Sequence, residues 1–329
     1  MEKFKVAIVQ EAPVFLNTPE SIKKAEPLIE QAAEKGARII AFPEIWFPGY
    51  PVWFDFASKA ALWEFAPPKE LYRLLVENAI TINGIYFKQL QDIAKKYSCF
   101  LVMGAHEKYG QTLYNSMIFF DKNGKDFWVH RKLMPTYTEK LIWGLGDGSG
   151  IGVLNTEFGV LGGLICWEHW MPLARAAMHS FGELIHVAQW PAADDLHQLA
   201  SRHYAFEGQC FVLAAGTYLK KTDVIEGASS LKNISQETLD FLDSMDTGSS
   251  DVLHNGGSAV IGPDSNYLNE PLFDKSDTII CEIDPEKVIE IRMAIETNGH
   301  YSRPDIFKLE VDATPRKGVR FVNENSKDN

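Results

Sequence analysis

One stretch, residues 160–172, most constrains how this 329-residue chain can fold. Its apolar first half, VLGGLI, predicts a buried strand, and Cys166 follows directly at the carboxyl end of that strand. Residues 173–180 (LARAAMHS) have helical composition, so we expect a strand, a sharp turn and a helix. In α/β proteins ligands bind at the carboxyl ends of strands, and a helix N-terminus there favours a thiolate. Taken alone, however, a free cysteine is more often a small core residue.

Composition bounds the class of protein. With 46% hydrophobic residues the chain can bury a large core, and its length suits one large domain with a tail. The formal net charge of −12 argues against nucleic acid or an anionic membrane as a partner, because either would need clustered lysine and arginine. The chain runs from Met1 straight into a strand-like segment without an apolar signal or membrane span, so we expect a cytoplasmic protein.

Neither a disulfide framework nor a metal site is indicated. The cysteines are far apart and form no CxxC pair, so we expect free thiols at Cys99, Cys166, Cys210 and Cys281. His203 and Glu207 are one helical turn apart, but without an HExxH pattern such a pair is typical of a contact on a helix face. We therefore expect no metal.

Short apolar runs alternate with helical segments along the chain. Strands are predicted at residues 4–10, 37–43, 99–104, 113–120, 126–130, 181–189, 210–216, 258–262 and 278–283, and helices at 21–35, 83–96 and 196–208. The chain thus opens as β-α-β, while the Asn-Gly pair at 123–124 predicts a hairpin and an antiparallel part of the sheet. These patterns indicate an α/β fold.

Two segments depart from this pattern. Residues 220–255 are rich in Ser, Asp, Lys and Gly around one short helical patch, and they predict an exposed insertion too poor in apolar residues for its own core. Residues 308–329 are polar and charged, so we expect a C-terminal tail that is disordered or packs on a neighbouring subunit.

Three polar residues stand at predicted strand ends: Glu44 after RIIAFP, Lys132 after FWVHR, and Cys166 after LGGLI. Each has an ordinary alternative, because most glutamates and lysines are solvated. Glu44, however, is flanked by apolar residues that would raise its pKa toward that of a working acid or base. Together the three residues supply a base, a cation and a thiol nucleophile, which are the groups needed to add a thiolate to an unsaturated carbon.

These residues lie in segments that resemble a known family. FPEIWFPGYP, HRKLMPTYTEK with WGLGDGS, and GGLICWEHWMP are similar, in this order, to the three blocks of the nitrilase (carbon–nitrogen hydrolase) superfamily, and HYSRPDIF resembles a C-terminal block of nitrilases proper. The resemblance implies a four-layer α-β-β-α sandwich in a single domain at 1–307. It also implies a homo-oligomer built from dimers that join helix to helix, with growth into spirals or filaments in many nitrilases.

The resemblance also implies roles for the site residues. Glu44 would be the general base, Lys132 would stabilise anionic intermediates, Cys166 would be the nucleophile, and Glu139 would help to place the lysine. Cys-Trp-Glu at 166–168 resembles the nitrilase branch, which implies hydrolysis of a nitrile to the carboxylic acid and ammonia, without a cofactor or metal. Asn298 departs from the family pattern, in which aspartate is common, and it bears on packing or assembly more than on chemistry.

Alternatives remain at this point. An amidase or carbamoylase would use the same Glu-Lys-Cys triad, a nitrile or cyanide hydratase would release the amide, and a silent assembly or binding module would use the fold alone. Position beside the strand ends makes five residues candidates for the pocket wall, although core packing explains each of them equally well: Tyr50, Trp167, His169, Trp190 and Pro191. An aromatic wall would favour aryl or arylaliphatic nitriles.

Overall fold

The computed structural model of the chain describes residues 2–316 and contains two mixed β-sheets. The first has six strands, in the spatial order β13 (Asp277–Ile283), β1 (Phe4–Gln10), β2 (Ala37–Ala41), β3 (Phe100–Tyr109), β4 (Thr112–Phe120) and β5 (Phe127–Arg131). The second has seven, in the order β10 (Tyr218–Lys220), β11 (Val252–Ile261), β9 (Phe211–Ala215), β8 (Ile185–Gln189), β7 (Gly159–Ile165) and β6 (Leu154–Thr156), with β12 (Leu272–Phe273) beside β11. Strands β1, β2 and β3 run parallel, as do β7, β8 and β9.

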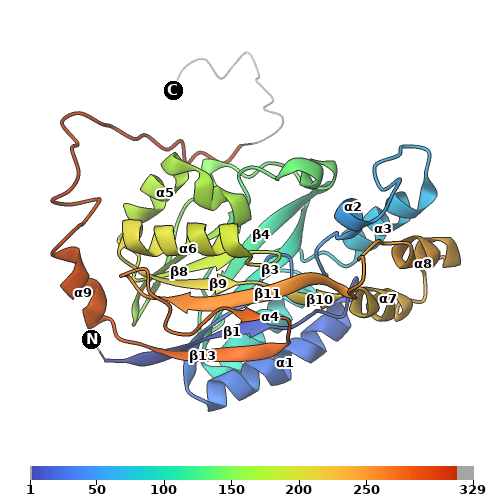
Figure 1. Ribbon diagram of the computed structural model, residues 1–329, viewed down its shortest axis with the longest axis horizontal. Helices are drawn as coiled ribbons and strands as arrows, with labels where there is room; N and C mark the ends of the chain where they lie inside the picture. Colours follow the sequence, from blue (N-terminus) through green and yellow to red (C-terminus); the bar gives the residue numbers. More distant parts are fainter. Residues whose placement is uncertain (1, 317–329) are drawn as a thin grey trace, which may run out of the picture.

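The two sheets face each other, and helices cover both outer faces (Figure 1). Helices α1 (Thr18–Glu34) and α4 (Ile85–Tyr97) pack on the first sheet, and α5 (Pro172–His179) and α6 (Asp195–Gly208) lie over the second. This arrangement confirms the expected four-layer α-β-β-α sandwich.

Strand β1 shows why the strand segments are apolar without interruption. Val6 and Ile8 pack into the core between the sheets, whereas Ala7 and Val9 pack into the core under α1 and α4. Successive side chains of a strand point to opposite faces, so a strand buried on both faces has no polar alternation. The predicted hairpin is also confirmed, since β4 and β5 pair antiparallel and Gly124 in their turn has a φ of +63°.

Most of residues 220–255 are exposed or half-buried, but the segment also packs on the rest of the chain. They form α7 (Lys221–Ser229), α8 (Gln236–Asp243) and the first residues of β11. Phe241 and Leu242 of α8 are buried in a third core, which also contains residues of α2 (Trp53–Phe56) and α3 (Ala66–Glu77). These four helices lie together at one end of the molecule (Figure 1). The segment is too small for its own core, but it shares one with α2 and α3.

After α9 (Glu286–Arg292) the chain runs back over the surface (Figure 1). The first part of the predicted tail, residues 308–316, is exposed, and the backbone N–H of Arg316 donates to the Asp147 carboxylate at 2.7 Å. The rest of the predicted tail, 317–329, lies outside the described residues. Within residues 2–316, none of the helices has the length and apolar character needed to cross a bilayer.

Candidate active site

The turn after β7 holds the thiol in a strained backbone conformation. Cys166 has a φ of +53°, a left-handed value that non-glycine residues adopt rarely and mostly where function requires it. It begins a short 3₁₀ helix, η3 (Cys166–Trp170), which leads into α5. The predicted order of strand, sharp turn and helix is therefore confirmed. The thiol itself is buried and faces a cavity.

Glu44 lies in the loop after β2 and is also buried. The loop passes directly over Gly104 of β3, where an added Cβ would collide with the backbone from Pro43 to Ile45. Asn115 on β4 donates its side-chain amide to Oε1 of Glu44 at 2.7 Å. Sequence reasoning missed Asn115, although a polar residue in the middle of the apolar strand LYNSMIFF is a signal that could have indicated it.

Lys132 follows β5, and its buried ammonium group lies between two carboxylates. Nζ of Lys132 is 2.8 Å from Oε1 of Glu44 and 2.8 Å from Oε2 of Glu139. Glu139 sits on the 3₁₀ helix η1 (Tyr137–Leu141), where it accepts from the backbone N–H of Thr136 at 2.6 Å and from the hydroxyl of Tyr50 at 2.8 Å. The structure thus brings together the four residues that the sequence selected: Glu44, Lys132, Glu139 and Cys166.

Burial dominates the electrostatics of this group. It raises the pKa of Glu44 to about 7 against the opposing charge of Lys132. Burial would lower the pKa of Lys132, but the neighbouring Cys166, Glu44 and Glu139 raise it above its ordinary value. Burial and the Glu44 charge raise the pKa of Cys166, whereas Lys132 and a hydrogen bond from the Trp167 backbone N–H lower it. Burial therefore favours the neutral thiol at Cys166, and a carboxyl group with a pKa of about 7 lies close to it.

A donor set for a metal also exists in principle. Ligand atoms of Glu44, Glu139 and Cys166 all lie within 4.8 Å of one another. The Lys132 ammonium, however, already lies within 2.8 Å of both carboxylates and takes the place that a cation would need. This residue set suits a lysine-organised thiol site rather than a metal centre.

Glu168 connects the turn at Cys166 to the loop that begins at Lys132. Its buried carboxylate accepts from the backbone N–H groups of Ile165 at 2.6 Å and Leu133 at 2.7 Å, and from Nε2 of His130 at 2.8 Å. Burial would raise the pKa of Glu168, but the His130 charge and these bonds lower it below the ordinary value. The sequence marked Glu168 only by resemblance, and its structural role depends on His130, which sequence reasoning did not select.

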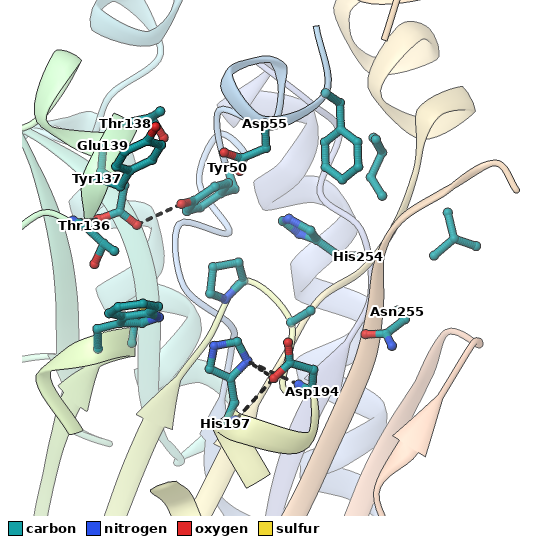
Figure 2. Close-up of a pocket in the computed structure, with 17 residues that line it drawn as sticks. Tyr50, Asp55, Thr136, Tyr137, Thr138, Glu139, Asp194, His197, His254 and Asn255 are labelled. Atoms are coloured by element: carbon teal, nitrogen blue, oxygen red, sulfur yellow. Dashed lines mark hydrogen bonds and ion pairs between the residues drawn. The ribbon is translucent and has the colours of Figure 1, made fainter. Parts of the chain in front are cut away.

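Glu139 and Cys166 line a cavity of about 530 Å³ (Figure 2). Three predicted wall residues line it: Tyr50, Trp167 and Pro191. Most of the polar lining was not predicted. It comes from α2, from η1 and the residue before it, from the N-terminal end of α6 and from β11. These residues are, in the same order, Asp55; Thr136, Tyr137 and Thr138; Asp194 and His197; and His254 and Asn255. Figure 2 shows Tyr50 pointing to Glu139, and Asp194 paired with His197 below them.

Two of the predicted wall residues do not line the cavity, which corrects their expected place. Trp190 is fully buried, and its indole N–H donates to Ser201 at 3.1 Å. His169 is buried behind the nucleophile turn, with Nδ1 2.7 Å from the carbonyl oxygen of Cys166. Both follow a strand as predicted, but the chain there folds toward α6 rather than toward the cavity.

The chain has clear relatives. It matches the family described as carbon-nitrogen hydrolase over residues 5–293. An aliphatic nitrilase of Rhodococcus rhodochrous is 37% identical over 335 residues, covering 97% of this chain and 82% of that protein. A bifunctional nitrilase/nitrile hydratase of Lupinus angustifolius is 35% identical over 323 residues, covering 98% and 90%. Among solved structures, a carbon-nitrogen hydrolase of Helicobacter pylori superposes with a TM-score of 0.67 at 20% identity, covering 93% of this chain and 97% of that one.

Proposed function

The chain belongs to the carbon–nitrogen hydrolase family, within its nitrilase branch, and we propose that it hydrolyses an organic nitrile to the carboxylic acid and ammonia through covalent intermediates on Cys166. One observation carries this proposal: a buried thiol lies within 4.8 Å of the Glu44 and Glu139 carboxylates, and an ammonium group bridges both. A base, a nucleophile and a fixed positive charge then meet at one end of a cavity.

The first half of the reaction forms a thioimidate. The sulfur of Cys166 bonds to the nitrile carbon while one C–N π bond breaks, and the thiol proton passes through Glu44 to the nitrile nitrogen. Glu44 then takes a proton from a water molecule as the oxygen of that water adds to the thioimidate carbon. The proton passes on to the nitrogen, which gives a tetrahedral species. The Trp167 backbone N–H and the Lys132 ammonium are the proposed donors to the developing negative charge, and such donors are worth about 3 to 4 kcal/mol each.

The second half decides the product. As the C–N bond breaks, the hydroxyl of the tetrahedral species becomes a carbonyl and its proton passes through Glu44 to the leaving nitrogen. Ammonia is released and a thioester remains, which a second water hydrolyses to the acid and the free thiol. Breaking the C–S bond instead releases the amide after one water has been consumed. The Lupinus relative is named a bifunctional nitrilase/nitrile hydratase, so an amide product is the second candidate outcome for this chain.

Substitution of the nucleophile tests the assignment. For Cys166→Ala and Cys166→Ser, we expect ammonia release from phenylacetonitrile and benzonitrile to fall to background, with unchanged far-UV circular dichroism. Substantial ammonia release by the alanine variant would refute the role of Cys166. Glu44→Gln should abolish turnover with the fold intact, and loss of the fold instead would indicate a structural role.

A substrate panel separates the nitrilase from its rivals. Nitriles and the matching amides are assayed side by side for acid, amide and ammonia. A nitrilase forms the acid from nitriles, and a hydratase forms the amide from nitriles. An amidase or carbamoylase is active on amides alone. A chain active on none of these, with a thiol at Cys166 that nitriles do not protect from labelling, would be a binding module. The intact set of Glu44, Lys132, Glu139 and Cys166 argues against that last outcome.

We propose neutral aryl and arylaliphatic nitriles as the substrate class. Tyr50, Phe56 and Trp167 supply aromatic surface to the cavity. Its two further carboxylates, Asp55 and Asp194, disfavour a substrate that carries its own negative charge. We expect phenylacetonitrile to have a higher kcat/KM than 4-cyanobutanoate, and the reverse order would contradict this class. Butyronitrile belongs in the panel because the Rhodococcus relative is named an aliphatic nitrilase.

We also propose that the chain assembles as a homo-oligomer built from dimers that join helix to helix. The outer helix layer over the second sheet exposes large apolar side chains: Leu173 on α5 and Leu196, Leu199 and Phe206 on α6. Apolar groups gathered on one face of a protein commonly mark an interface.

A further inference from the structure

Behind the nucleophile turn lies a line of buried polar side chains that the reaction above does not use. Nδ1 of His169 is 2.7 Å from the carbonyl oxygen of Cys166, and its Nε2 is 3.0 Å from Nε2 of His186. Nδ1 of His186 is 2.8 Å from Oε1 of Glu183, whose Oε2 accepts from the hydroxyl of Tyr204 at 2.6 Å. None of these side chains is more than 1% exposed.

For neutral imidazoles, the contacts set where the protons lie. A carbonyl oxygen only accepts hydrogen bonds, so Nδ1 of His169 carries a proton. In a neutral imidazole the other nitrogen then accepts, which requires a proton on Nε2 of His186 and leaves Nδ1 of His186 as an acceptor. The donor to that nitrogen must be Glu183, as a neutral carboxylic acid. Every bond in the line then points toward the carbonyl oxygen of Cys166.

A charge-separated arrangement also satisfies each contact, with the Glu183 proton shifted along the line so that His169 is an imidazolium. Burial disfavours it, because both charges would lie away from water. Burial raises the pKa of Glu183 to about 7, and burial together with His186 lowers the pKa of His169 to about 3. The neutral arrangement therefore prevails while Glu183 holds its proton.

We propose that Glu183, His186 and His169 are positioning residues that act through the peptide between Cys166 and Trp167. The carbonyl oxygen of this peptide accepts from His169, and its N–H, on Trp167, lowers the pKa of the adjoining Cys166 thiol. Hydrogen bonds in a chain polarise one another, so an amide that accepts a bond at its oxygen donates more strongly through its nitrogen. The line thus strengthens the N–H that stabilises the thiolate and the developing charge, and it holds Cys166 at its φ of +53°.

The fold makes room for this line. Gly162 of β7 lies against the Glu183 carboxyl, which an added Cβ would strike. His186 stacks on the ring of Tyr204, with the ring centres 3.7 Å apart. The groups that face Glu183 from the surrounding elements and influence its titration are His179 of α5, His186 of β8, Tyr204 of α6, Cys210 before β9 and Arg292 of α9, which donates to the backbone oxygen of Glu183.

The first test removes the donor to Cys166. His169→Phe keeps a ring of similar size but cannot bond to the carbonyl oxygen. We expect kcat for the nitrile to fall about tenfold or more with KM within about twofold, because the lost stabilisation belongs to the transition state. We also expect slower alkylation of Cys166 by iodoacetamide, followed at that peptide by mass spectrometry, with its pH dependence moved to higher pH.

The second test asks whether Glu183 acts as a neutral acid. In Glu183→Gln the amide nitrogen can donate to His186 and the amide oxygen can accept from Tyr204, so the line survives. We expect this variant to keep kcat at pH 7 within about twofold, whereas Glu183→Leu should resemble His169→Phe. In the wild type, Glu183 loses its proton above pH 7 and then accepts from Nδ1 of His186. Nε2 of His186 in turn accepts from Nε2 of His169, so that Nδ1 of His169 presents a lone pair to the Cys166 carbonyl instead of an N–H. The resulting alkaline fall in kcat should move to higher pH in Glu183→Gln.

A control separates positioning from stability. Thr238→Val removes a partly buried hydrogen bond, the one from Thr238 on α8 to Glu70 on α3, at the other end of the molecule from α5 and α6 (Figure 1). It should lower the melting temperature without changing kcat. Wild-type kcat and alkylation in His169→Phe, or a loss in Glu183→Gln as large as that in Glu183→Leu, would overturn the proposal. The measurements of kcat and KM rest on the proposed nitrile hydrolysis. If the wild type hydrolysed no nitrile, that function would fail, while the alkylation arm would still decide the role of the line.

Discussion

At the scale of single residues, the site depends on an unequal number of buried charges. Glu44 and Glu139 are two carboxylates that share one ammonium group, that of Lys132, and all three side chains are buried. Two full negative charges there would be costly, so one carboxyl binds a proton near neutral pH. Burial raises the pKa of Glu44 to about 7, which makes this carboxylate able to receive the thiol proton.

The pKa of Glu44 predicts how activity depends on pH. A general base must be ionised in the free enzyme, so we expect kcat/KM for the nitrile to fall as the pH drops through about 7, the pKa that burial gives Glu44. Initial rates of ammonia release between pH 5 and 8 measure this fall. A kcat/KM that stays constant down to pH 5 would contradict the assignment of Glu44 as the base.

The same shift has the opposite effect on stability. A carboxyl whose pKa is raised on folding stabilises the native state below its unfolded value of 4.5, and this contribution is lost as the pH rises through about 7. Activity therefore requires the ionisation that folding disfavours.

Lys132 can be tested as the charge that balances the site. Lys132→Met keeps most of the side-chain volume but removes the ammonium group from between the two carboxylates. We expect turnover to be abolished and the Glu44 pKa to rise further, with a loss of about 3 to 5 kcal/mol in the free energy of unfolding, as for a buried pair that loses one partner. Urea unfolding followed by circular dichroism measures the loss, and unchanged stability would mean that the pair is not formed in solution.

At the scale of elements, the site is built from the segments that leave the carboxyl ends of the strands. The loop after β2, the residue after β5 and the turn after β7 present Glu44, Lys132 and Cys166, and they meet because the two sheets face each other. The patterns of apolar runs predicted these strand ends. They could not predict how closely one backbone passes another, and this close approach is the reason that Gly104 becomes essential.

Gly104→Ala should therefore damage the site without touching a catalytic group. Its Cβ would collide with the backbone around Glu44, so the loop must move. We expect a loss of kcat of at least about tenfold, since small displacements of a catalytic group have large effects on rate. Gly110→Ala is the control. It has a φ of +60° and open space around it, so it should lose stability while kcat is retained. Equal kcat values for the two variants would count against the argument.

At the scale of the whole molecule, the outer faces differ in character. Helices α5 and α6 expose large apolar side chains, and α5 continues directly from the nucleophile turn (Figure 1). Covering that face would both remove apolar surface from water and restrain the helix that follows Cys166. The proposed assembly through this face thus bears on the site.

Leu199→Asp tests the assembly. Leu199 is 63% exposed on α6, so a charge there should be tolerated by the fold but not by an interface. We expect sedimentation velocity to show a smaller species than the wild type at the same concentration. Glu286→Gln, on helix α9, serves as the control. A wild type that sediments as a monomer at all concentrations would contradict the proposed dimer.

The sequence by itself determined the strand ends and the chemical groups placed there. A strand buried on both faces leaves an uninterrupted apolar run, and Glu44 and Cys166 each follow such a strand, whereas Lys132 follows the edge strand β5. It also carried the family resemblance, and with it the sandwich fold and the nitrilase branch. These features are local in the chain, so that pattern and residue type suffice to read them.

Only the tertiary structure decided how the remaining residues take part. Asn115 meets Glu44 across 71 positions of sequence, and Glu168 reaches His130 across 38. His169 turns away from the cavity because His186 and the Cys166 carbonyl hold it. Phe241 and Leu242 of α8 are buried because α2 and α3 complete their core. Each of these outcomes depends on a partner distant in the chain, and a partner's position in space is fixed only when the sheets and helices pack together.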